Sequence, residues 1–461
     1  MSSDTIESRS PQDPDEVVQV LPAADRSAVS RSVDAARDAA RGWASGPALN
    51  RTQALTAAAE ALAAQSERFA DLMVREVGKP AGEAAGEVTR GAGILRYFAQ
   101  QALDPDGQTY PAPDGMSLLM ARRHPHGVVG LITPWNFPLA IPLWKAAPAL
   151  AFGNGVVLKP SPYAIGCALE LKNLLDGVLP EGLFAMVAGE AEAGEALVDT
   201  VDAVSFTGSV DVGRQVALAA TGRHIPVQAE MGGQNASLVL PDADRDAAAA
   251  SVAAAAMGYA GQKCTATSRV IVVGNPEPFT EALAEAVRGL AVGDPADADT
   301  VVGPVITEDA RRKVLDAAEK ARVDGGNFLT GGRAGDGHGH FVEPTLVTGL
   351  PPDAELAREE VFGPIAAVLP ARDVDEAVEI SNGVRYGLVT SVYTRDLDRA
   401  LELVGRLDTG MLKVNAPTSG VDFHAPFGGE KASSIGPREQ GKAARDFYTS
   451  TRTITMSPLG T

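Results

Sequence analysis

The sequence has little that could stabilise it covalently or place it in a membrane. Its 461 residues include only two cysteines, Cys167 and Cys264, which cannot form a disulfide framework and fit a reducing compartment. We therefore expect a cytoplasmic protein. The first residues lack the basic stretch and apolar core of a signal peptide. The longest weakly polar run, residues 247–260, is shorter than the ~20 residues needed to cross a bilayer, so no membrane association is expected.

Basic residues and histidines are also scarce. The chain has 59 acidic residues against 40 basic ones, for a net charge of -19. That balance repels phosphate backbones, and no basic stripe offsets it, so nucleic acid is not an expected partner. His124 and His126 form one pair and His338 and His340 another, but neither pair has a third ligand nearby in sequence. We predict a turn and a surface loop there, and no metal.

What the sequence does have is a regular alternation of apolar strands and helices. The length allows about three domains or lobes. A first series has strands at 156–158, 183–187, 203–206 and 227–231 and helices at 164–175, 191–197 and 210–220. A second series follows Cys264, with strands at 270–273, 365–369, 388–393 and 411–414 and helices at 278–290, 308–322, 374–380 and 397–407. This predicts an α/β fold with parallel sheets covered by helices on both faces, which bind ligands at the carboxyl ends of strands.

The N-terminal part is predicted to be mainly scaffold. A polar leader ends near residue 22, and apolar residues at helical spacing then predict helices at 27–43, 51–77 and 82–101. Residues 104–115 are rich in Pro, Gly and Asp and predict a loop. Residues 116–123 and 127–133 predict two strands joined at the first histidine pair.

Three polar residues stand where elements end. Cys264 lies between the predicted helix 247–260 and the strand 270–273. Asn136 follows a strand in a loop stiffened by two prolines. Glu230 ends a buried strand, where a carboxylate is costly to bury without a task, and two glycines follow it.

These three residue types have a shared chemical logic. A thiolate is a strong nucleophile, an amide donor stabilises the oxyanion that its attack creates, and a carboxylate with a raised pKa can take a proton from water. The set suits acyl or aldehyde chemistry. Taken singly, Cys264 also fits an inert buried thiol, Asn136 a turn-stabilising amide and Glu230 a salt-bridged carboxylate.

Seven short motifs are spread along nearly the whole chain: TPWNFP at 133–138, LKPS at 158–161, FTGS at 206–209, EMGG at 230–233, GQKC at 261–264, EVFGP at 360–364 and PFGG at 426–429. Together and in this order they resemble the motifs of the NAD(P)-dependent aldehyde dehydrogenase superfamily. The resemblance implies a Rossmann-type dinucleotide-binding lobe, an α/β catalytic lobe and a small β bridging element. The implied boundaries are 1–106 and 126–232 for the first, 233–432 for the second, and 107–125 with 433–461 for the third. The bridging element implies a homodimer or homotetramer.

The resemblance also implies roles for individual residues. Cys264 is the expected nucleophile, Asn136 and the Cys264 backbone amide the oxyanion hole, and Glu230 the base that activates water. Lys145 matches a family lysine near the same cleft. The residues expected to line the substrate tunnel are Phe137, Trp144, Thr265 and Phe427. The small-molecule substrate is an aldehyde, oxidised to its acid through a thiohemiacetal and a thioester.

For the cofactor, the resemblance implies NAD or NADP. The expected contacts are Thr133, Pro134, Trp135, Lys159, Ser161, Gly208, Ser209, Gly213, Gly232, Glu360 and Phe362. Backbone amides where Gly208 and Ser209 open a helix can meet a diphosphate. Many NAD-selective relatives have a glutamate where this chain has Pro162, and that carboxylate repels a 2′-phosphate. We therefore predict that NADP is accepted at least as readily as NAD.

The substrate is less strongly specified. Residues 431–441 and 261–269 are similar to the α-ketoglutaric semialdehyde (2,5-dioxopentanoate) dehydrogenase branch. Succinic semialdehyde dehydrogenases usually have an arginine where this chain has Trp144, so a simple aliphatic or aromatic aldehyde is an alternative substrate. Two further alternatives are a CoA-acylating dehydrogenase, which commonly lacks the base that Glu230 provides, and a non-enzymatic structural role.

Overall fold

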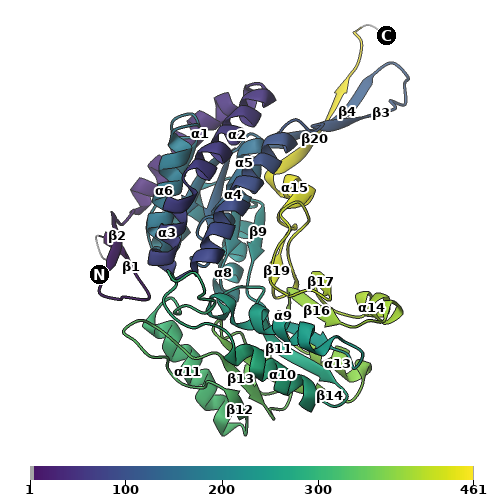
Figure 1. Cartoon of the computed structure of the whole chain (residues 1–461). Helices are drawn as coiled ribbons and strands as arrows, with labels where there is room; N and C mark the ends of the chain where they lie inside the picture. The colour runs from purple at the N-terminus through teal and green to yellow at the C-terminus, as the bar shows by residue number, and fades with distance from the viewer. Residues whose placement is uncertain (1–4, 460–461) are drawn as a thin grey trace.

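The computed structural model describes residues 5–459 and has two α/β lobes and a projecting arm (Figure 1). The N-terminal half builds the upper lobe of Figure 1, and the lower lobe follows it in the chain. The C-terminal segment runs back along one side of both lobes and ends in the arm. The predicted alternation of strands and helices is therefore confirmed.

The first lobe is built on a six-stranded sheet in the order β19-β9-β8-β5-β6-β7. All neighbouring strands are parallel except the edge strand β19, which is antiparallel to β9. The bounds are β5 Val128–Ile132, β6 Gly155–Lys159, β7 Phe184–Met186, β8 Ala203–Thr207, β9 Val227–Glu230 and β19 Ser434–Ile435. Every residue of β5 and β6 is buried, as expected for a sheet covered on both faces.

Two separate apolar cores cover the two faces of this sheet. Val129 and Leu131 of β5 pack into one core with helices α2 to α6, while Val128 and Ile132 pack into the other with α1, α7 and α8. This alternation follows from the two-residue period of a strand. The helix bounds are α1 Arg26–Ser45, α2 Ala48–Ala64, α3 Ser66–Val77, α4 Ala81–Gln101, α5 Ala140–Ala151, α6 Ile165–Asp176, α7 Ala191–Thr200 and α8 Val210–Gly222.

Two N-terminal predictions are wrong in detail. The single helix expected at 51–77 is two helices, α2 and α3, because Gln65 leaves helical geometry with φ -111° and ψ 22°. Leu62 and Phe69 on either side face the same core, so the apolar spacing continues through the break. The polar leader contains a hairpin of β1 Thr5–Arg9 and β2 Val17–Pro22.

The second lobe has a seven-stranded sheet in the order β12-β13-β14-β11-β10-β16-β17, parallel except for the β12–β13 pair. The strand bounds are β10 Asn235–Val239, β11 Thr267–Val273, β12 Asn327–Thr330, β13 Thr345–Thr348, β14 Ile365–Ala371, β16 Val389–Tyr393 and β17 Met411–Val414. The helix bounds are α9 Arg245–Met257, α10 Glu277–Arg288, α11 Glu308–Val323, α12 Glu355–Arg358, α13 Val374–Asn382 and α14 Leu397–Val404. Three strands of this sheet, β10, β12 and β13, were not predicted from the sequence, and β10 lies between β11 and β16.

The arm is a three-stranded antiparallel sheet of β3 Gly107–Tyr110, β4 Leu118–Pro125 and β20 Thr449–Met456. The loop predicted at 104–115 therefore contains a strand, whose four residues are all exposed and give no apolar pattern. The strands β4 and β5 follow one another in sequence but belong to different sheets. Short elements near the C-terminus are β15 Tyr386–Gly387, β18 Glu430–Lys431 and α15 Ala444–Tyr448.

Across residues 5–459, no helix is both long and apolar enough to cross a membrane.

Candidate active site

Cys264 is presented by a strained turn rather than by a regular helix end. The helix predicted to reach residue 260 ends at Met257, and Tyr259 and Ala260 then take left-handed φ angles of 55° and 53°. Gly261 continues the turn at φ 66°, where a Cβ would lie 2.2 Å from the Gly363 carbonyl oxygen. Left-handed non-glycine residues cost energy and are concentrated at functional sites. The alanine-rich pattern gave no sign of this turn.

Two buried amides hold the loop that carries Cys264. Gln262 Nε2 donates to the Pro304 carbonyl at 3.2 Å, and its Oε1 accepts from the Ile306 amide at 2.8 Å. Asn235 Nδ2 donates to the carbonyls of Cys264 and Ala266, both at 2.8 Å. Asn235 was missed by sequence analysis because its partners lie about thirty positions away.

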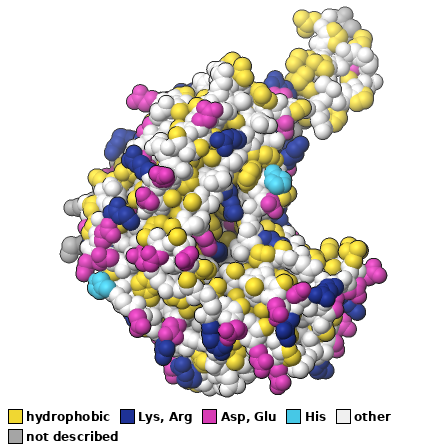
Figure 2. Space-filling model, viewed as in Figure 1, with side chains coloured by type: hydrophobic (Ala, Val, Ile, Leu, Met, Phe, Trp, Pro, Cys, Tyr) yellow, Lys and Arg dark blue, Asp and Glu magenta, His cyan; other side chains and the backbone are white. Residues whose placement is uncertain are grey.

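A cavity of about 250 Å³ lies in front of Cys264 and opens between the lobes. All four residues predicted for the substrate tunnel line it: Phe137, Trp144, Thr265 and Phe427. The Trp144 and Phe427 rings pack with their centroids 5.6 Å apart. Figure 2 shows the hollow between the lobes, with basic side chains set inside it. The size suits a small molecule rather than a drug-sized ligand.

Asn136 lies against the Cys264 loop, as the oxyanion-hole prediction requires. Its side chain is buried, and Nδ2 donates to the Gln262 carbonyl at 2.9 Å. An amide nitrogen carries two hydrogens, so one remains for another acceptor.

Glu230 ends β9 and is deeply buried. Ser434 Oγ donates to its Oε2 at 2.5 Å, while Oε1 has no hydrogen-bond partner among the described residues. Burial raises the pKa of Glu230 well above its usual value, and the charge of Glu439 adds to this. The Ser434 hydrogen bond and the charges of Lys145 and Arg438 oppose the shift. A carboxylate with a raised pKa is a stronger proton acceptor than an ordinary glutamate, as the base role requires.

Lys145 lies behind the cavity and is not among the residues that line it. Its buried Nζ forms an ion pair with Glu439 and donates to Ser205 Oγ at 2.8 Å. Glu439 Oε2 is buried without a partner among the residues described. Sequence analysis missed Glu439 and Ser434, because both come from the C-terminal segment that returns to this lobe.

A second buried ion pair, Lys79 with Glu87, stands at the cavity wall, which Glu87 lines. Here every carboxylate oxygen is used: Oε2 pairs with Lys79, and Oε1 accepts from the backbone amides of Leu139 at 3.0 Å and Ala140 at 2.8 Å. Lys79 Nζ lies 3.9 Å from the centroid of the Phe137 ring. Burial lowers the pKa of Lys79, and the charge of Glu87 opposes that.

The side chains around Cys264 do not favour its thiolate. Burial raises the pKa of the Cys264 thiol to about 12, and the charges of Glu360, Glu230 and Glu439 add to the shift. Only the backbone amide of Cys264 acts the other way. Reaction at neutral pH thus requires a proton acceptor or a positively charged ligand beside the sulfur.

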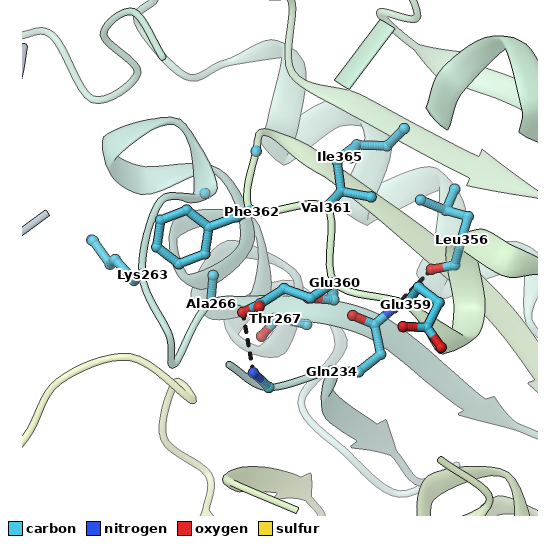
Figure 3. A pocket seen from close by; sticks show the side chains of 14 residues that line it. Gln234, Lys263, Ala266, Thr267, Leu356, Glu359, Glu360, Val361, Phe362 and Ile365 are labelled. Atoms are coloured by element: carbon cyan, nitrogen blue, oxygen red, sulfur yellow. Dashed lines mark hydrogen bonds between the residues drawn. The ribbon is translucent and has the colours of Figure 1, made fainter. Parts of the chain in front are cut away.

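A second pocket is lined by two of the residues predicted for the cofactor, Glu360 and Phe362 (Figure 3). Glu360 Oε1 accepts from the Gly233 amide at 3.1 Å, and a Cβ on Gly232 would lie 1.9 Å from Oε2, so a larger residue at position 232 would displace the Glu360 carboxylate from its present place. Phe362 has a left-handed φ of 62°, and its ring packs edge-on to Trp135 with centroids 5.9 Å apart. Burial raises the pKa of Glu360 to about 7, opposed by the Gly233 hydrogen bond.

Other predicted cofactor residues surround the ends of β5 and β6. Lys159 ends β6, and its Nζ donates to the carbonyls of Pro160 at 3.0 Å and Gly189 at 2.8 Å. Burial lowers the pKa of Lys159 to about 8. Ser161 Oγ accepts from the Tyr163 amide, at the start of the short helix that begins with Pro162. Thr133, just before Pro134, has a buried hydroxyl without a partner in the described chain.

The glycines at the start of α8 have a packing explanation. A Cβ on Gly213 would lie 2.5 Å from Met231 Sδ, and one on Gly208 would lie 2.6 Å from the Phe206 ring. Ser209 is the N-cap residue of α8, and its side chain makes no capping hydrogen bond. The helix start therefore approaches the sheet closely and leaves its first amides open to a ligand.

Comparisons with known proteins agree along the whole chain. The model of the aldehyde dehydrogenase family matches residues 1–454. The alpha-ketoglutaric semialdehyde dehydrogenase of Bacillus subtilis is 38% identical over 466 residues, covering 99% of this chain and 96% of that protein. The structure of an NAD-dependent aldehyde dehydrogenase from Sinorhizobium meliloti gives a TM-score of 0.95 at 35% identity, covering 98% of this chain and 91% of that one. An E. coli NADP-dependent enzyme gives a TM-score of 0.95 at 32% identity, with 98% and 95% covered.

Proposed function

This chain belongs to the aldehyde dehydrogenase family, and on that premise we propose that Cys264, Glu230 and Asn136 oxidise an aldehyde to its carboxylic acid. The observation that carries the proposal is the pairing of a thiol at a small-molecule cavity with a buried carboxyl group that has one free oxygen. A thiol and a general base with these properties can form and then hydrolyse an acyl intermediate.

The reaction begins when the Cys264 sulfur adds to the aldehyde carbon, and the thiol proton leaves for a nearby base. The new alkoxide oxygen accepts hydrogen bonds from Asn136 Nδ2 and the Cys264 backbone amide. A bound oxidised nicotinamide supplies the hydride acceptor that allows this thiohemiacetal to become a thioester. Glu230 then takes a proton from water as the water oxygen attacks the thioester carbon. The C–S bond breaks, the acid leaves and Cys264 is restored as a thiol.

Residues of the second pocket are suited to hold that cofactor. The carboxylate of Glu360 lies close to the backbone of Gly232, and ribose hydroxyls could donate hydrogen bonds to this carboxylate. Phe362 and Trp135 supply flat apolar surface beside it. The open amides at the start of α8 suit a diphosphate, and Lys159 suits the other ribose.

We further propose that NADP is accepted at least as readily as NAD. Position 162 holds a proline, so no carboxylate there repels the 2′-phosphate of NADP. Lys159, at the end of the adjacent strand, is a cation that could attract it. A kcat/KM for NAD more than about 100-fold above that for NADP, or roughly 2.7 kcal/mol of discrimination, would contradict the proposal.

The substrate we propose is a semialdehyde such as 2,5-dioxopentanoate. Support comes from the semialdehyde dehydrogenases among the relatives and from the small cavity. The alternative is a simple aliphatic or aromatic aldehyde, favoured by the apolar walls of Trp144 and Phe427. Comparing kcat/KM for semialdehydes and for uncharged aldehydes of equal length separates the two, and equal values would remove the semialdehyde proposal.

Absorbance of the reduced nicotinamide, followed over an aldehyde panel with both cofactors, tests the catalytic roles. Cys264→Ala should abolish turnover, since no other described thiol lies at the cavity: Cys167 is buried elsewhere, on α6. Release of acyl-CoA in preference to free acid would favour the CoA-acylating alternative. No reduction with any aldehyde would favour a structural role.

We also propose the domain boundaries and the assembly that follow from the family. Residues 1–106 and 126–232 form the dinucleotide-binding domain, 233–432 the catalytic domain, and 107–125 with 433–461 the bridging element of a homodimer or homotetramer. The arm of β3, β4 and β20 supports this, because its strands extend away from the body of the chain (Figure 1). Light scattering after gel filtration tests it, and a monomer at micromolar concentration would contradict it. The two free cysteines support a cytoplasmic setting.

A further inference from the structure

The cavity in front of Cys264 is lined by one charged side chain that has no partner. Four charged residues line it: Glu83, Glu87, Arg90 and Lys263. Glu83 pairs with Lys263 at 2.6 Å, and Glu87 pairs with Lys79 behind the wall. Within residues 5–459, Arg90 makes no hydrogen bond or ion pair, and its side chain is only partly buried. A guanidinium is therefore available to a ligand in this cavity.

A second cation, Lys413, stands near Arg90, and the carboxylate of Asp422 stands near Lys413. Lys413 donates to the carbonyls of Ser419 at 2.7 Å and Gly420 at 2.6 Å, both of which line the cavity. Burial lowers the pKa of Lys413, the charge of Asp422 opposes this, and that of Arg90 adds to it. Since the whole chain carries a net charge of -19, a local cation is what would attract an anionic substrate to this opening.

The placement of Arg90 on α4 sets a length for that substrate. Glu83 contacts the loop that carries the nucleophile, because its partner Lys263 directly precedes Cys264, and both line the cavity. Seven residues of helix separate Glu83 from Arg90, a rise of about 10 Å. Arginine side chains on a helix lean toward its N-terminus, here over Gly86, which leaves that space open. An extended ω-oxo acid of about five carbons, with its bond to sulfur and a hydrogen bond of about 2.9 Å to a guanidinium, spans such a gap.

We propose that Arg90 binds the carboxylate of an ω-oxo carboxylic acid while its aldehyde carbon meets Cys264. The inference rests on the proposed function and adds the residue that selects an anionic over a neutral aldehyde. The planar guanidinium matches a carboxylate with two parallel hydrogen bonds, which a lysine cannot do. The position usually filled by arginine in succinic semialdehyde dehydrogenases holds Trp144 in this chain, so the cation comes from a different helix.

The experiment compares 5-oxopentanoate with pentanal, which have equal numbers of carbons and differ in the carboxylate. The readout is the ratio of kcat/KM for the acid to that for pentanal. Arg90→Met should lower this ratio by about 10- to 100-fold, mainly through the KM for the acid. Arg90→Lys should lower it less, because the charge is kept and the paired geometry is lost. A ratio that stays within about 3-fold of wild type in Arg90→Met would overturn the proposal.

Arg96→Met is the matched control, because Arg96 is an exposed arginine on the same helix and does not line the cavity. It should leave the ratio unchanged, and an equal fall in this variant would also count against Arg90. Because the readout is a ratio, a variant that folds poorly lowers both activities and leaves the ratio informative. If the wild-type protein reduces neither cofactor with either aldehyde, the proposed function itself fails; if it oxidises both equally well, only the inference fails.

Discussion

Two buried lysine–glutamate pairs lie close to the residues of the active site and differ in how fully their carboxylate oxygens are satisfied. In the pair of Lys79 with Glu87 both carboxylate oxygens have partners, two backbone amides at one oxygen and the lysine at the other. Lys145 and Glu439 leave one carboxylate oxygen unpartnered, and the neighbouring Glu230 leaves another. Both pairs are almost completely removed from solvent.

The difference separates a structural role from a chemical one. The carboxylate of Glu87 holds the start of α5 in place through two backbone amides, and neither of its oxygens is free to accept a proton from a substrate or water. A buried carboxyl group with a free oxygen is costly to keep, and such groups are concentrated where protons are transferred. Burial alone therefore does not distinguish the two sites, whereas hydrogen-bond satisfaction does.

Removing the charge of Glu87 should produce the largest effect on stability. Glu87→Gln leaves Lys79 without its counterion in a dry site, and we expect the free energy of unfolding to fall by about 3–5 kcal/mol. Urea denaturation followed by circular dichroism measures it. Glu83→Gln is the matched control one turn away, where the pair with Lys263 is partly exposed and the loss should be about 1 kcal/mol or less. Similar losses in the two variants would show that complete burial of the Lys79–Glu87 pair does not make the loss of its charge more costly.

Glu230→Gln should affect activity and stability in opposite directions. Steady-state turnover should fall by about 100- to 1000-fold, with a first burst of reduced nicotinamide retained, because the base is needed only for hydrolysis. Stopped-flow absorbance separates the burst from the steady rate. Loss of the burst together with the steady rate would place Glu230 in the first step instead.

The stability of the same variant tests the raised pKa. Because folding raises the pKa of Glu230 above its ordinary 4.5, the folded state binds this proton more tightly than the unfolded chain does. The stability contributed by the protonated group is complete below pH 4.5 and is lost as the pH rises toward the folded pKa. We expect Glu230→Gln to be at least as stable as wild type at pH 8, with its advantage shrinking toward pH 4.5. A less stable variant at pH 8 would contradict this account.

The smallest effect is expected at Glu360, whose pKa of about 7 means that its charge changes within the pH range of ordinary assays. If its ionised form accepts hydrogen bonds from ribose, the Kd for NAD should decrease by about 10-fold between pH 6 and pH 8. Isothermal titration calorimetry measures this on the free enzyme, and Glu360→Gln should flatten the dependence. A wild-type Kd that is independent of pH in this range would exclude the role.

The sequence predicted those parts of the site in which the signal is local. Cys264, Glu230 and Asn136 each stand beside the end of a strand or helix that its own apolar pattern predicted, and the predicted tunnel residues line one cavity. The helix through residue 260 was predicted too long because alanine favours helix and nothing nearby indicates a left-handed turn.

What could not be predicted depends on distant partners. Ser434 and Glu439 meet Glu230 and Lys145 only because the C-terminal segment returns to the first lobe. Asn235 holds the Cys264 loop from β10, a strand that sequence analysis missed. Arg90 has only the ordinary spacing of a helical arginine. Its significance appears once the other charged residues that line the cavity prove to be in ion pairs, Glu83 with Lys263 and Glu87 with Lys79.

The left-handed turn before Cys264 also affects where mutations should be tolerated. Gln262 links this turn to the backbone of Pro304 and Ile306, more than forty positions further along the chain. The position of the Cys264 sulfur therefore depends on residues 304–306, which contribute no reactive group. In a deep mutational scan selected for activity, Gln262 itself, and proline at position 306, which removes the donated amide, should be as poorly tolerated as changes at residues that touch the aldehyde. A map of chemical roles alone would overlook both.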